Sequence, residues 1–234
     1  MKDAMTNIIM DAGPAPGRVA RKRAEVRRKL LLAGFDLVGR QGLDAFAVAD
    51  LTEAADCSKG AFYSHFANRD EFVAELVSQA IEVVGTALDR YSANLPGDEA
   101  LATGLRYSLT LARLHPAWGH FVSAVASTPR YAFAGLGKRL ASDIARARAE
   151  GRIAFRDPQA ALLLASGTFL AGAIGSGLGI MGADTPGEAT RHLLLGLGVS
   201  PERASALTKD PLPALNFESA VVKAIAPASP AQRP

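Results

Sequence analysis

Between positions 58 and 69 the chain gathers side chains that suit contact with a nucleic acid. The candidates are Ser58, Lys59, Gly60, Ala61, Tyr63, Ser64, His65 and Arg69. Lys59 and His65 can meet phosphate oxygens, and Tyr63 offers a hydroxyl donor together with a flat aromatic face. The glycine and the alanine keep a helix slim enough to approach base edges. A helix built only to fill a core would not need this set, so the stretch predicts a DNA-reading helix.

Two short helical patterns would position these side chains. The first covers about Val48–Ala55 and the second about Ser58–Phe66, with a tight polar junction between them. Phe62 and Phe66 lie four residues apart and form the inner face of the second helix, and Ser58 can cap its start. The pair is typical of a helix-turn-helix, whose second helix enters the major groove of DNA while the first crosses the backbone.

The next helix is expected to begin at Arg69. Asn68 and Glu71 form a capping-box pattern around that start. Free backbone N–H groups at a helix start favour an anion, so Arg69 joins the candidates for phosphate contact.

The positive charge of the chain is concentrated beside this motif. The net charge is +3: residues 1–69 carry 11 Lys/Arg against 8 Asp/Glu, whereas residues 70–234 carry 15 of each. Most of the excess lies in Gly17–Lys29, where seven basic residues face Glu25 alone. A basic segment beside a helical motif is the electrostatic footprint of a phosphate-binding face. A solvated basic helix end would have the same composition.

The overall composition is that of a globular protein, with 49% hydrophobic and 21% charged residues in 234. This length allows one large domain or two small ones. The single cysteine excludes an intramolecular disulfide and a multi-cysteine metal site. The first residues lack the ordered regions of a signal peptide, so a reducing, cytoplasmic setting is expected.

Helical periodicity extends along most of the chain, and no segment shows the alternation of a strand. Proline and glycine mark the helix ends, as at Gly42, Pro96-Gly97 and Gly151. Helices are expected over about 21–41, 48–55, 58–66, 69–91, 98–114, 117–126, 129–150, 158–181, 185–197 and from 201. The predicted fold class is all-α.

Residues 30–72 resemble the DNA-binding domain of the TetR (tetracycline-repressor) family of transcriptional regulators. LLLAGFDLVGRQG is similar to the family's first helix, and SKGAFYSHFANRDEF is similar to its recognition helix and the start of the following helix. The matched segment is about a fifth of the chain. The remainder resembles the family in its helix count and in LLLGLGVSPERA near the C-terminus.

The resemblance, together with the glycines and prolines near both ends, divides the chain into four expected parts. These are a flexible basic arm (1–20), a three-helix helix-turn-helix domain (21–68), an antiparallel helical domain for ligand binding and dimerisation (69–210) and a proline-rich tail (211–234). Helices at about 158–181 and 186–197 would form the interface of a homodimer. The implied partners are a double-stranded DNA operator and a small-molecule effector, with no cofactor, metal or catalytic residues.

Three residues depart from the family pattern. Ala47 stands where a Ser or Thr usually caps the second helix, a contact that contributes about 1 kcal/mol. Asp56 replaces the usual turn glycine, although Asp tolerates left-handed backbone. Cys57 replaces a valine-like residue. It is either a small buried hydrophobe or a thiol whose oxidation would release DNA.

The C-terminal half offers other patterns that compete with this interpretation. Residues 160–183 carry no charge, and Gly167, Ala171, Gly175 and Gly179 lie four apart, as in paired membrane helices. The segment is rich in small residues and lacks aromatic anchors, so a buried soluble helix is preferred to a membrane span. Residues 177–182 match a dinucleotide fingerprint but follow no strand. His115 and His120 are poorly placed to share a metal.

A ligand pocket is expected among the middle helices. The candidate residues are Tyr107, Leu111, His115, Trp118, Phe121, Tyr131, Phe133 and Phe169. Plain core packing would use the same residue types. The sequence therefore predicts a dimeric regulator, a repressor released from a pseudo-palindromic operator by a small, mostly apolar ligand. A helical small-molecule-binding enzyme and a membrane-anchored helical protein are the alternatives.

Overall fold

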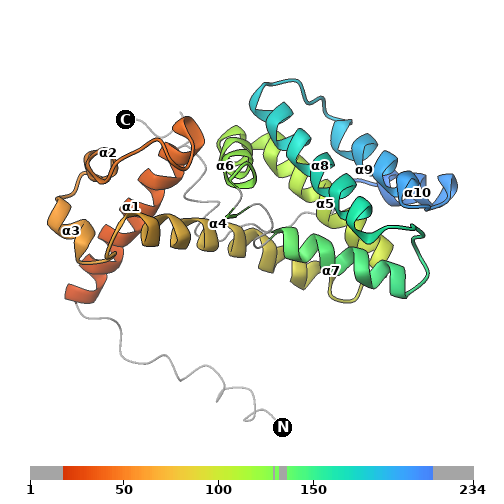
Figure 1. Cartoon of the computed structure of the whole chain (residues 1–234), viewed down its shortest axis with the longest axis horizontal. Coiled ribbons are helices and arrows are strands. Elements are labelled where there is room, and N and C mark those ends of the chain that lie inside the picture. The colour runs from red at the N-terminus through yellow and green to blue at the C-terminus, as the bar shows by residue number, and fades with distance from the viewer. Residues whose placement is uncertain (1–17, 129, 132–135, 213–234) are drawn as a thin grey trace, which may run out of the picture.

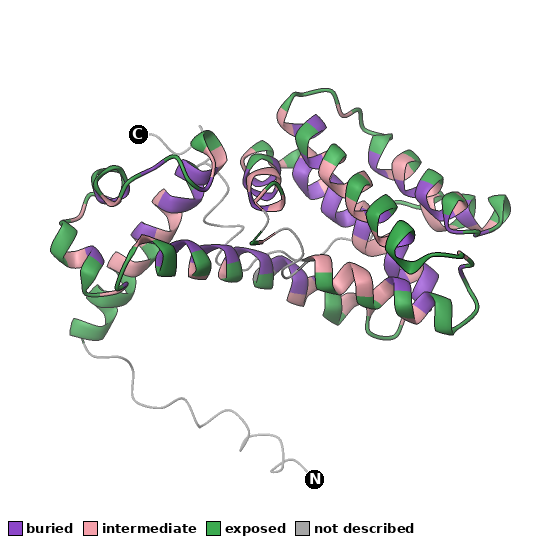
Figure 2. Cartoon of the chain, in the orientation of Figure 1, coloured by how far each residue is buried: buried purple, intermediate pink, exposed green. Residues whose placement is uncertain are grey.

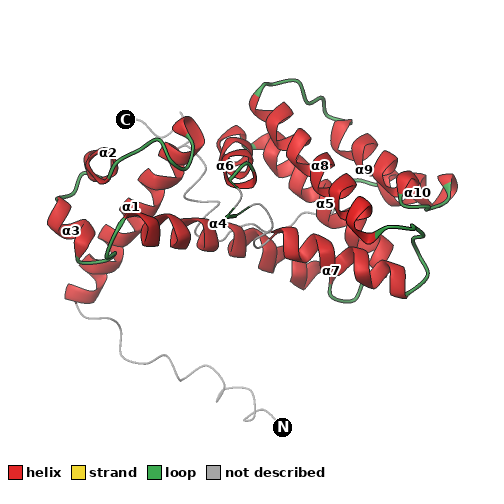
Figure 3. Ribbon diagram, in the orientation of Figure 1, coloured by secondary structure: helices red, strands yellow, loops and turns green. Residues whose placement is uncertain are grey.

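The computed structural model describes residues 18–128, 130–131 and 136–212, which hold ten α-helices and no strand (Figures 1 and 3). The all-α prediction is confirmed for this part of the chain. The helices are α1 Arg18–Gln41, α2 Val48–Ala54, α3 Lys59–Tyr63, α4 Arg69–Ser92, α5 Gly97–Leu114, α6 Pro116–Ala126, α7 Leu136–Ala149, α8 Pro158–Gly177, α9 Thr185–Gly196 and α10 Pro201–Lys209.

Several helix ends differ from the expected ones. The helix α1 already includes residues 18–20, which the sequence places in the arm, because no helix breaker follows Gly17. The helix α3 ends at Tyr63, where His65 N–H bonds the carbonyl of Phe62 in a tighter turn. The helix α8 ends at Gly177, because the chain turns at Gly179 with φ of +68°. The expected start of α7 at 129, its inner-face residue Phe133, residues 1–17 of the arm and residues 213–234 of the tail lie outside the described residues.

The first three helices form a small domain around aromatic side chains. Phe62 and Phe66 of the α3 segment meet Phe72 of α4, with ring centroids 5.0 to 5.9 Å apart. All three are at most 1% exposed. Burial of such rings contributes several kcal/mol each, so this cluster holds α3 against α1 and α4.

Two helices connect this small domain to the larger one (Figure 1). The long helix α4 runs from the small domain along the base of the larger domain. The helix α6 packs against α1, where Phe35 stacks on Phe121 at 4.5 Å and lies 6.4 Å from Trp118. The same core therefore continues from the small domain into the larger domain.

The larger domain surrounds α5, which contacts α6, α7, α8, α9 and α10. Its second core is aliphatic and includes Leu101, Leu109 and Leu194. At the start of α5 the buried carboxylate of Asp98 accepts a hydrogen bond from Arg203 at 2.8 Å and pairs with Arg152 at 3.5 Å. This carboxylate ties α5 to α10 and to the loop after α7.

Candidate nucleic-acid interface and effector cavity

The helix α3 presents one face to solvent and buries the other (Figure 2). Ser58 caps it by accepting a hydrogen bond from the backbone of Ala61 at 3.1 Å, as predicted. With Phe62 fully buried, Tyr63 is 56% exposed. Lys59, Gly60 and Ser64 are also exposed, and Ala61 and His65 are half-buried. The structure thus brings the predicted α3 residues together on one accessible surface.

The turn before α3 shows how the departures from the family pattern are accommodated. Asp56 has φ of +50°, in the left-handed region that a turn glycine would occupy. Ala47 makes no side-chain cap to α2, but its own N–H donates to Asp50 Oδ2 at 2.8 Å. One half of a capping box is therefore present, and the other half is missing because alanine has no oxygen.

The basic start of α1 lies against the end of α3. Arg23 donates to the carbonyl of Ser64 at 3.1 Å, and the guanidinium of Arg27 lies 5.5 Å from the ring centre of Phe66. Burial, followed by the charges of Arg23 and Arg27, lowers the pKa of His65. A neutral imidazole offers one N–H donor, so the positive charge beside α3 comes from lysine and arginine.

Arg69 holds the small domain together. Its Nε donates to the carbonyl of Phe46 at 2.8 Å, its Nη2 donates to the carbonyl of Leu43, and its guanidinium covers the ring of Phe46 at 4.7 Å. At the same helix start Asn68 accepts from Glu71 N–H at 2.8 Å, as predicted. Glu71 accepts from Ala67 N–H at 2.7 Å instead of the N-cap residue. The guanidinium of Arg69 is thus engaged by backbone carbonyls, which the sequence did not indicate.

Cys57 is half-buried beside the turn. Burial and the nearby carboxylate of Asp56 raise the pKa of its thiol, against a smaller opposing effect of Lys29. A thiol that stays protonated is a poor target for oxidation, so the redox hypothesis has no support here.

A cavity of about 340 Å³ lies among α4, α5, α6, α7 and α8. Its apolar wall consists of Ile81, Leu88, Leu101, Leu105, Val122, Val125, Ala126, Leu140, Leu163, Phe169 and Leu170. Its polar side chains are Asp89, Ser92, Ser108, Arg139, Asp143 and Ser166, together with Tyr131. Mostly apolar walls with a few grouped polar atoms are typical of a small-molecule site.

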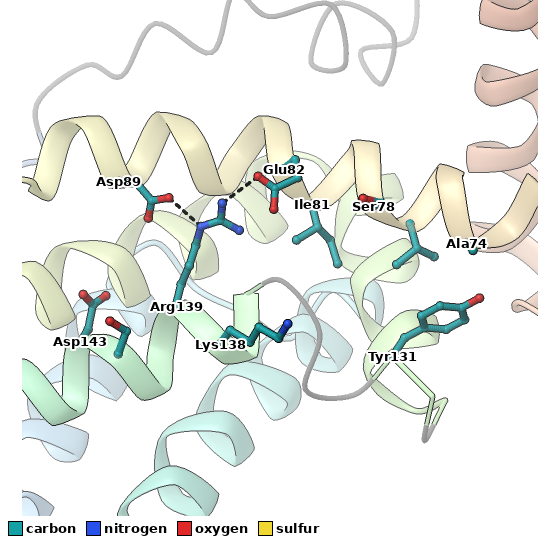
Figure 4. Close-up of a pocket in the computed structure, with 11 residues that line it drawn as sticks. Ala74, Ser78, Ile81, Glu82, Asp89, Tyr131, Lys138, Arg139 and Asp143 are labelled. Carbon is teal, nitrogen blue, oxygen red and sulfur yellow. Dashed lines mark hydrogen bonds and ion pairs between the residues drawn. The ribbon is translucent and has the colours of Figure 1, made fainter. Parts of the chain in front are cut away.

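An outer groove of about 710 Å³ continues from this cavity between α4 and α7 (Figure 4). Asp89, Tyr131, Arg139 and Asp143 line both spaces. Arg139 reaches from α7 to α4, where it bonds Glu82 and Asp89 at 2.9 Å each. Burial raises the pKa of Asp143, against the smaller opposing charge of Arg146. The junction of the two spaces is therefore the polar end of the cavity.

The predicted pocket residues are largely elsewhere. Tyr131 and Phe169 line the cavity, whereas Tyr107, Leu111, Trp118 and Phe121 are buried in the core that α1, α4, α5 and α6 share. Burial and the neighbouring Tyr91 raise the pKa of Tyr107 to about 12. His115 lies in the bend between α5 and α6, and Phe133 is outside the described residues. The lining residues of α7 were missed, because charged residues on an amphipathic helix ordinarily face solvent.

The outer surface of α8 is apolar and accessible. Leu163, Ile174 and Leu178 are 64, 43 and 70% exposed, and Gly167 and Ala171 lie on the same face between them. By length and composition α8 is the one helix in the described part of the chain that could cross a membrane, and 28% of its most apolar window is buried.

Two other patterns of the sequence find no support in the described residues. Residue 177 ends α8 and residues 178–182 form the turn after it, so the dinucleotide fingerprint at 177–182 lacks the preceding strand that such a site needs. Among the described residues no cluster of His, Cys, Asp and Glu is placed to hold a metal ion.

Comparison with known proteins gives two family matches. Residues 30–76 match the family described as bacterial regulatory proteins, tetR family, and residues 97–209 match the tetracyclin repressor-like C-terminal domain. Together these matches cover most of the described chain. A comparison with curated protein sequences finds no match.

Solved structures share the fold over most of the chain. The crystal structure of RolR in complex with the ligand resorcinol is 26% identical with a TM-score of 0.62, and the match covers 84% of this chain and 100% of RolR. A transcription regulator from Shewanella sp. PV-4 is 17% identical with a TM-score of 0.61, covering 74% and 97% of the two chains. A gamma-butyrolactone receptor is 18% identical with a TM-score of 0.54, covering 80% and 95%.

Proposed function

Because this chain belongs to the TetR family of ligand-responsive, DNA-binding transcriptional regulators, we propose that it acts as a homodimeric repressor. A small, mostly apolar molecule releases it from a pseudo-palindromic operator. The observation that carries the proposal is the exposed face of α3, which Ser58 caps and the buried Phe62 and Phe66 orient.

DNA is read by α3 in the major groove. Lys59 and the nearby arginines of α1 bind phosphates, Tyr63 and Ser64 reach base edges or sugar, and Gly60 and Ala61 permit close approach. His65 donates one N–H. Arg69 acts by positioning α4 and the loop before α2, since its Nε and Nη2 donate to backbone carbonyls of that loop. Because the basic residues of α1 add backbone contacts, affinity falls steeply with salt concentration.

The dimer forms through α8 and α9. The exposed apolar stripe on α8 suits burial against a second copy, and the small residues Gly167 and Ala171 allow close approach of two helices. Leu164 lies against Gly196 of α9, so the two helices offer one continuous surface. Their two-fold copies complete a four-helix bundle, which also accounts for the apolar character of α8 without a membrane.

The effector is a compact, uncharged ring compound with hydroxyl groups, bound in the cavity among α4 to α8. Two carboxylates, Asp89 and Asp143, share the polar end with the single guanidinium of Arg139. An anionic ligand would add charge to an already acidic, partly desolvated site, whereas a hydroxyl donates to a carboxylate without that cost. The binding of resorcinol, an aromatic diol, by the relative RolR supports this class.

A regulator of this kind works in the cytoplasm beside its DNA, and it needs no cofactor and no turnover. We expect the purified protein to return resorcinol chemically unchanged after prolonged incubation, as measured by chromatography. Consumption of the compound would favour the alternative of a small-molecule-binding enzyme.

The test begins with selection of genomic fragments by the purified protein. Tyr63→Ala and Lys59→Ala should each weaken binding to the selected operator by about tenfold, while sedimentation still shows a dimer. Lys209→Ala, which removes a lysine from α10, is the matched control and should bind as the unaltered protein does. Unchanged binding by both α3 variants would remove α3 as the DNA-reading helix.

A further inference from the structure

Gly85 is unexpected in the middle of the 24-residue helix α4, because glycine is a poor helix former. The structure gives a reason for it. A Cβ atom at this position would lie 2.6 Å from Nε of Arg139, and nearer still to its Cζ, which is closer than real atoms approach. Only a glycine leaves room for the guanidinium of Arg139 to rest on α4.

The guanidinium is held there from both sides. Nε of Arg139 donates to Asp89 Oδ2 at 2.9 Å, and Nη2 donates to Glu82 Oε2 at 2.9 Å (Figure 4). Glu82 and Asp89 are seven residues apart, so they lie two turns apart on one face of α4, with Gly85 between them. The planar fork of arginine suits two carboxylates at once, in a way that lysine would not. The hydrogen bond from Arg139 lowers the pKa of Glu82, so this carboxylate is charged at neutral pH.

The same guanidinium lines the cavity. Arg139 and Asp89 face the inner cavity and the outer groove, and Asp143 stands one turn further along α7. The helix α4 begins shortly after α3 ends, and no other helix lies between them. Any change in the direction of α4 therefore changes the position of α3, and in a dimer it changes the spacing of the two recognition helices.

We propose that Arg139, seated on Gly85 and bonded to Glu82 and Asp89, is a latch that sets the direction of α4 relative to the ligand-binding domain. The latch rests on the function proposed above, and Arg139 acts in it as a positioning residue for DNA binding. A ligand hydroxyl at the polar end of the cavity donates to Asp89 and competes with Arg139 for that carboxylate, which couples the occupied cavity to α4. Without the latch α4 samples more directions, so a smaller fraction of the dimer has the operator spacing.

Two variants break the latch by different routes. Gly85→Ala adds one methyl group where the guanidinium rests, and it changes no charge and no residue that lines the cavity. Alanine also favours the helix, so thermal stability should be kept. Arg139→Met removes the guanidinium fork and keeps an unbranched, flexible stem at this position. Arg90→Met is the matched control, because it makes the same charge change at an exposed position of α4.

The measurement is the Kd for the selected operator and for the same operator with one base pair inserted between its half-sites. The unaltered protein should discriminate strongly between the two. Gly85→Ala and Arg139→Met should each weaken binding to the true operator by about tenfold and change binding to the altered one little. The double variant should bind the operator with the same Kd as Arg139→Met, since both changes remove the same contact between Arg139 and α4.

The latch is overturned if both variants keep the discrimination of the unaltered protein, or if their effects add fully in the double variant. Arg90→Met must behave as the unaltered protein does, since an equal loss there would assign the effect to charge alone. Failure of the unaltered protein to bind any genomic fragment would instead overturn the proposed function, and with it the latch.

Discussion

The proposed recognition helix and the proposed effector cavity are built in opposite ways. The helix α3 and its turn form one short continuous segment, whose buried and exposed faces follow from spacing alone. The cavity takes its lining from five helices between Ile81 and Leu170. A local site depends on a few strong contacts, whereas a site between helices depends on how several of them pack. The two regions should therefore respond differently to substitution.

The largest expected difference is in stability. Phe62→Ala empties the fully buried centre of the aromatic cluster and should cost roughly 3 to 5 kcal/mol of unfolding free energy. Phe169→Ala, at the wall of an existing cavity, should cost clearly less because its ring is only half-buried. Urea unfolding of both variants measures this, and equal losses would contradict the comparison.

The next largest effect is a pH-dependent loss of stability in the larger domain, at Asp98. Burial by itself raises the pKa of Asp98, but the hydrogen bond and charge of Arg203, with Arg152, outweigh it, so the pKa lies below its usual value. Its contribution is therefore present above the unfolded pKa of about 4 and is lost as pH falls through the lower folded value. Asp98→Asn should cost about 2 kcal/mol at pH 7. Melting temperatures of both proteins should converge as the pH falls below about 4, and a constant gap would contradict this.

A smaller effect should separate effector binding from operator binding. Gly104 lines the cavity, and a Cβ atom added there would meet nothing closer than a carboxylate oxygen of Asp143 at 4.0 Å, so Gly104→Leu fills part of the space. Affinity for resorcinol, used as a probe of the proposed effector class and measured by calorimetry, should fall about tenfold, or 1.4 kcal/mol, with operator binding kept within about twofold. Tyr63→Ala should do the reverse, weakening operator binding and leaving resorcinol affinity unchanged. A variant that loses both activities together would show that the regions are not separable in this way.

The smallest expected effect is a gain in stability at the start of α2. Ala47→Ser supplies the missing oxygen of the half-formed capping box and should stabilise α2 by about 0.5 to 1 kcal/mol. The midpoint of urea unfolding measures it, with Ala47→Val as a control that adds bulk and no acceptor. An equal response to serine and valine would argue against a cap.

The same contrast explains what could be predicted from the sequence. The cap at Ser58, the buried Phe62 and Phe66 and the left-handed Asp56 were predictable, because each depends on neighbours within a few residues. The helix order was predictable for the same reason, since proline, glycine and capping residues mark most of the ends.

The cavity was not predictable because aromatic residues serve two purposes. Trp118 and Phe121 were expected in the pocket, yet they pack on Phe35 of α1 and join the two domains. Arg139 and Asp143 gave no signal, because a charged residue on a helix is usually solvated. The packing of α7 on α4, α5 and α8 turns them toward the cavity. Arg69 was misleading in the same way, since the carbonyls that it binds are more than twenty residues away in the chain.

The central claim is that two copies of α3 read DNA as a symmetric pair. A footprint of the purified protein on its selected genomic fragment tests this most directly. We predict two protected, inverted half-sites whose centres lie about 10 base pairs, or a multiple of that, apart. Protection should disappear at equal protein concentration with Tyr63→Ala. A single unsymmetrical site, or protection that Tyr63→Ala leaves intact, would contradict the claim.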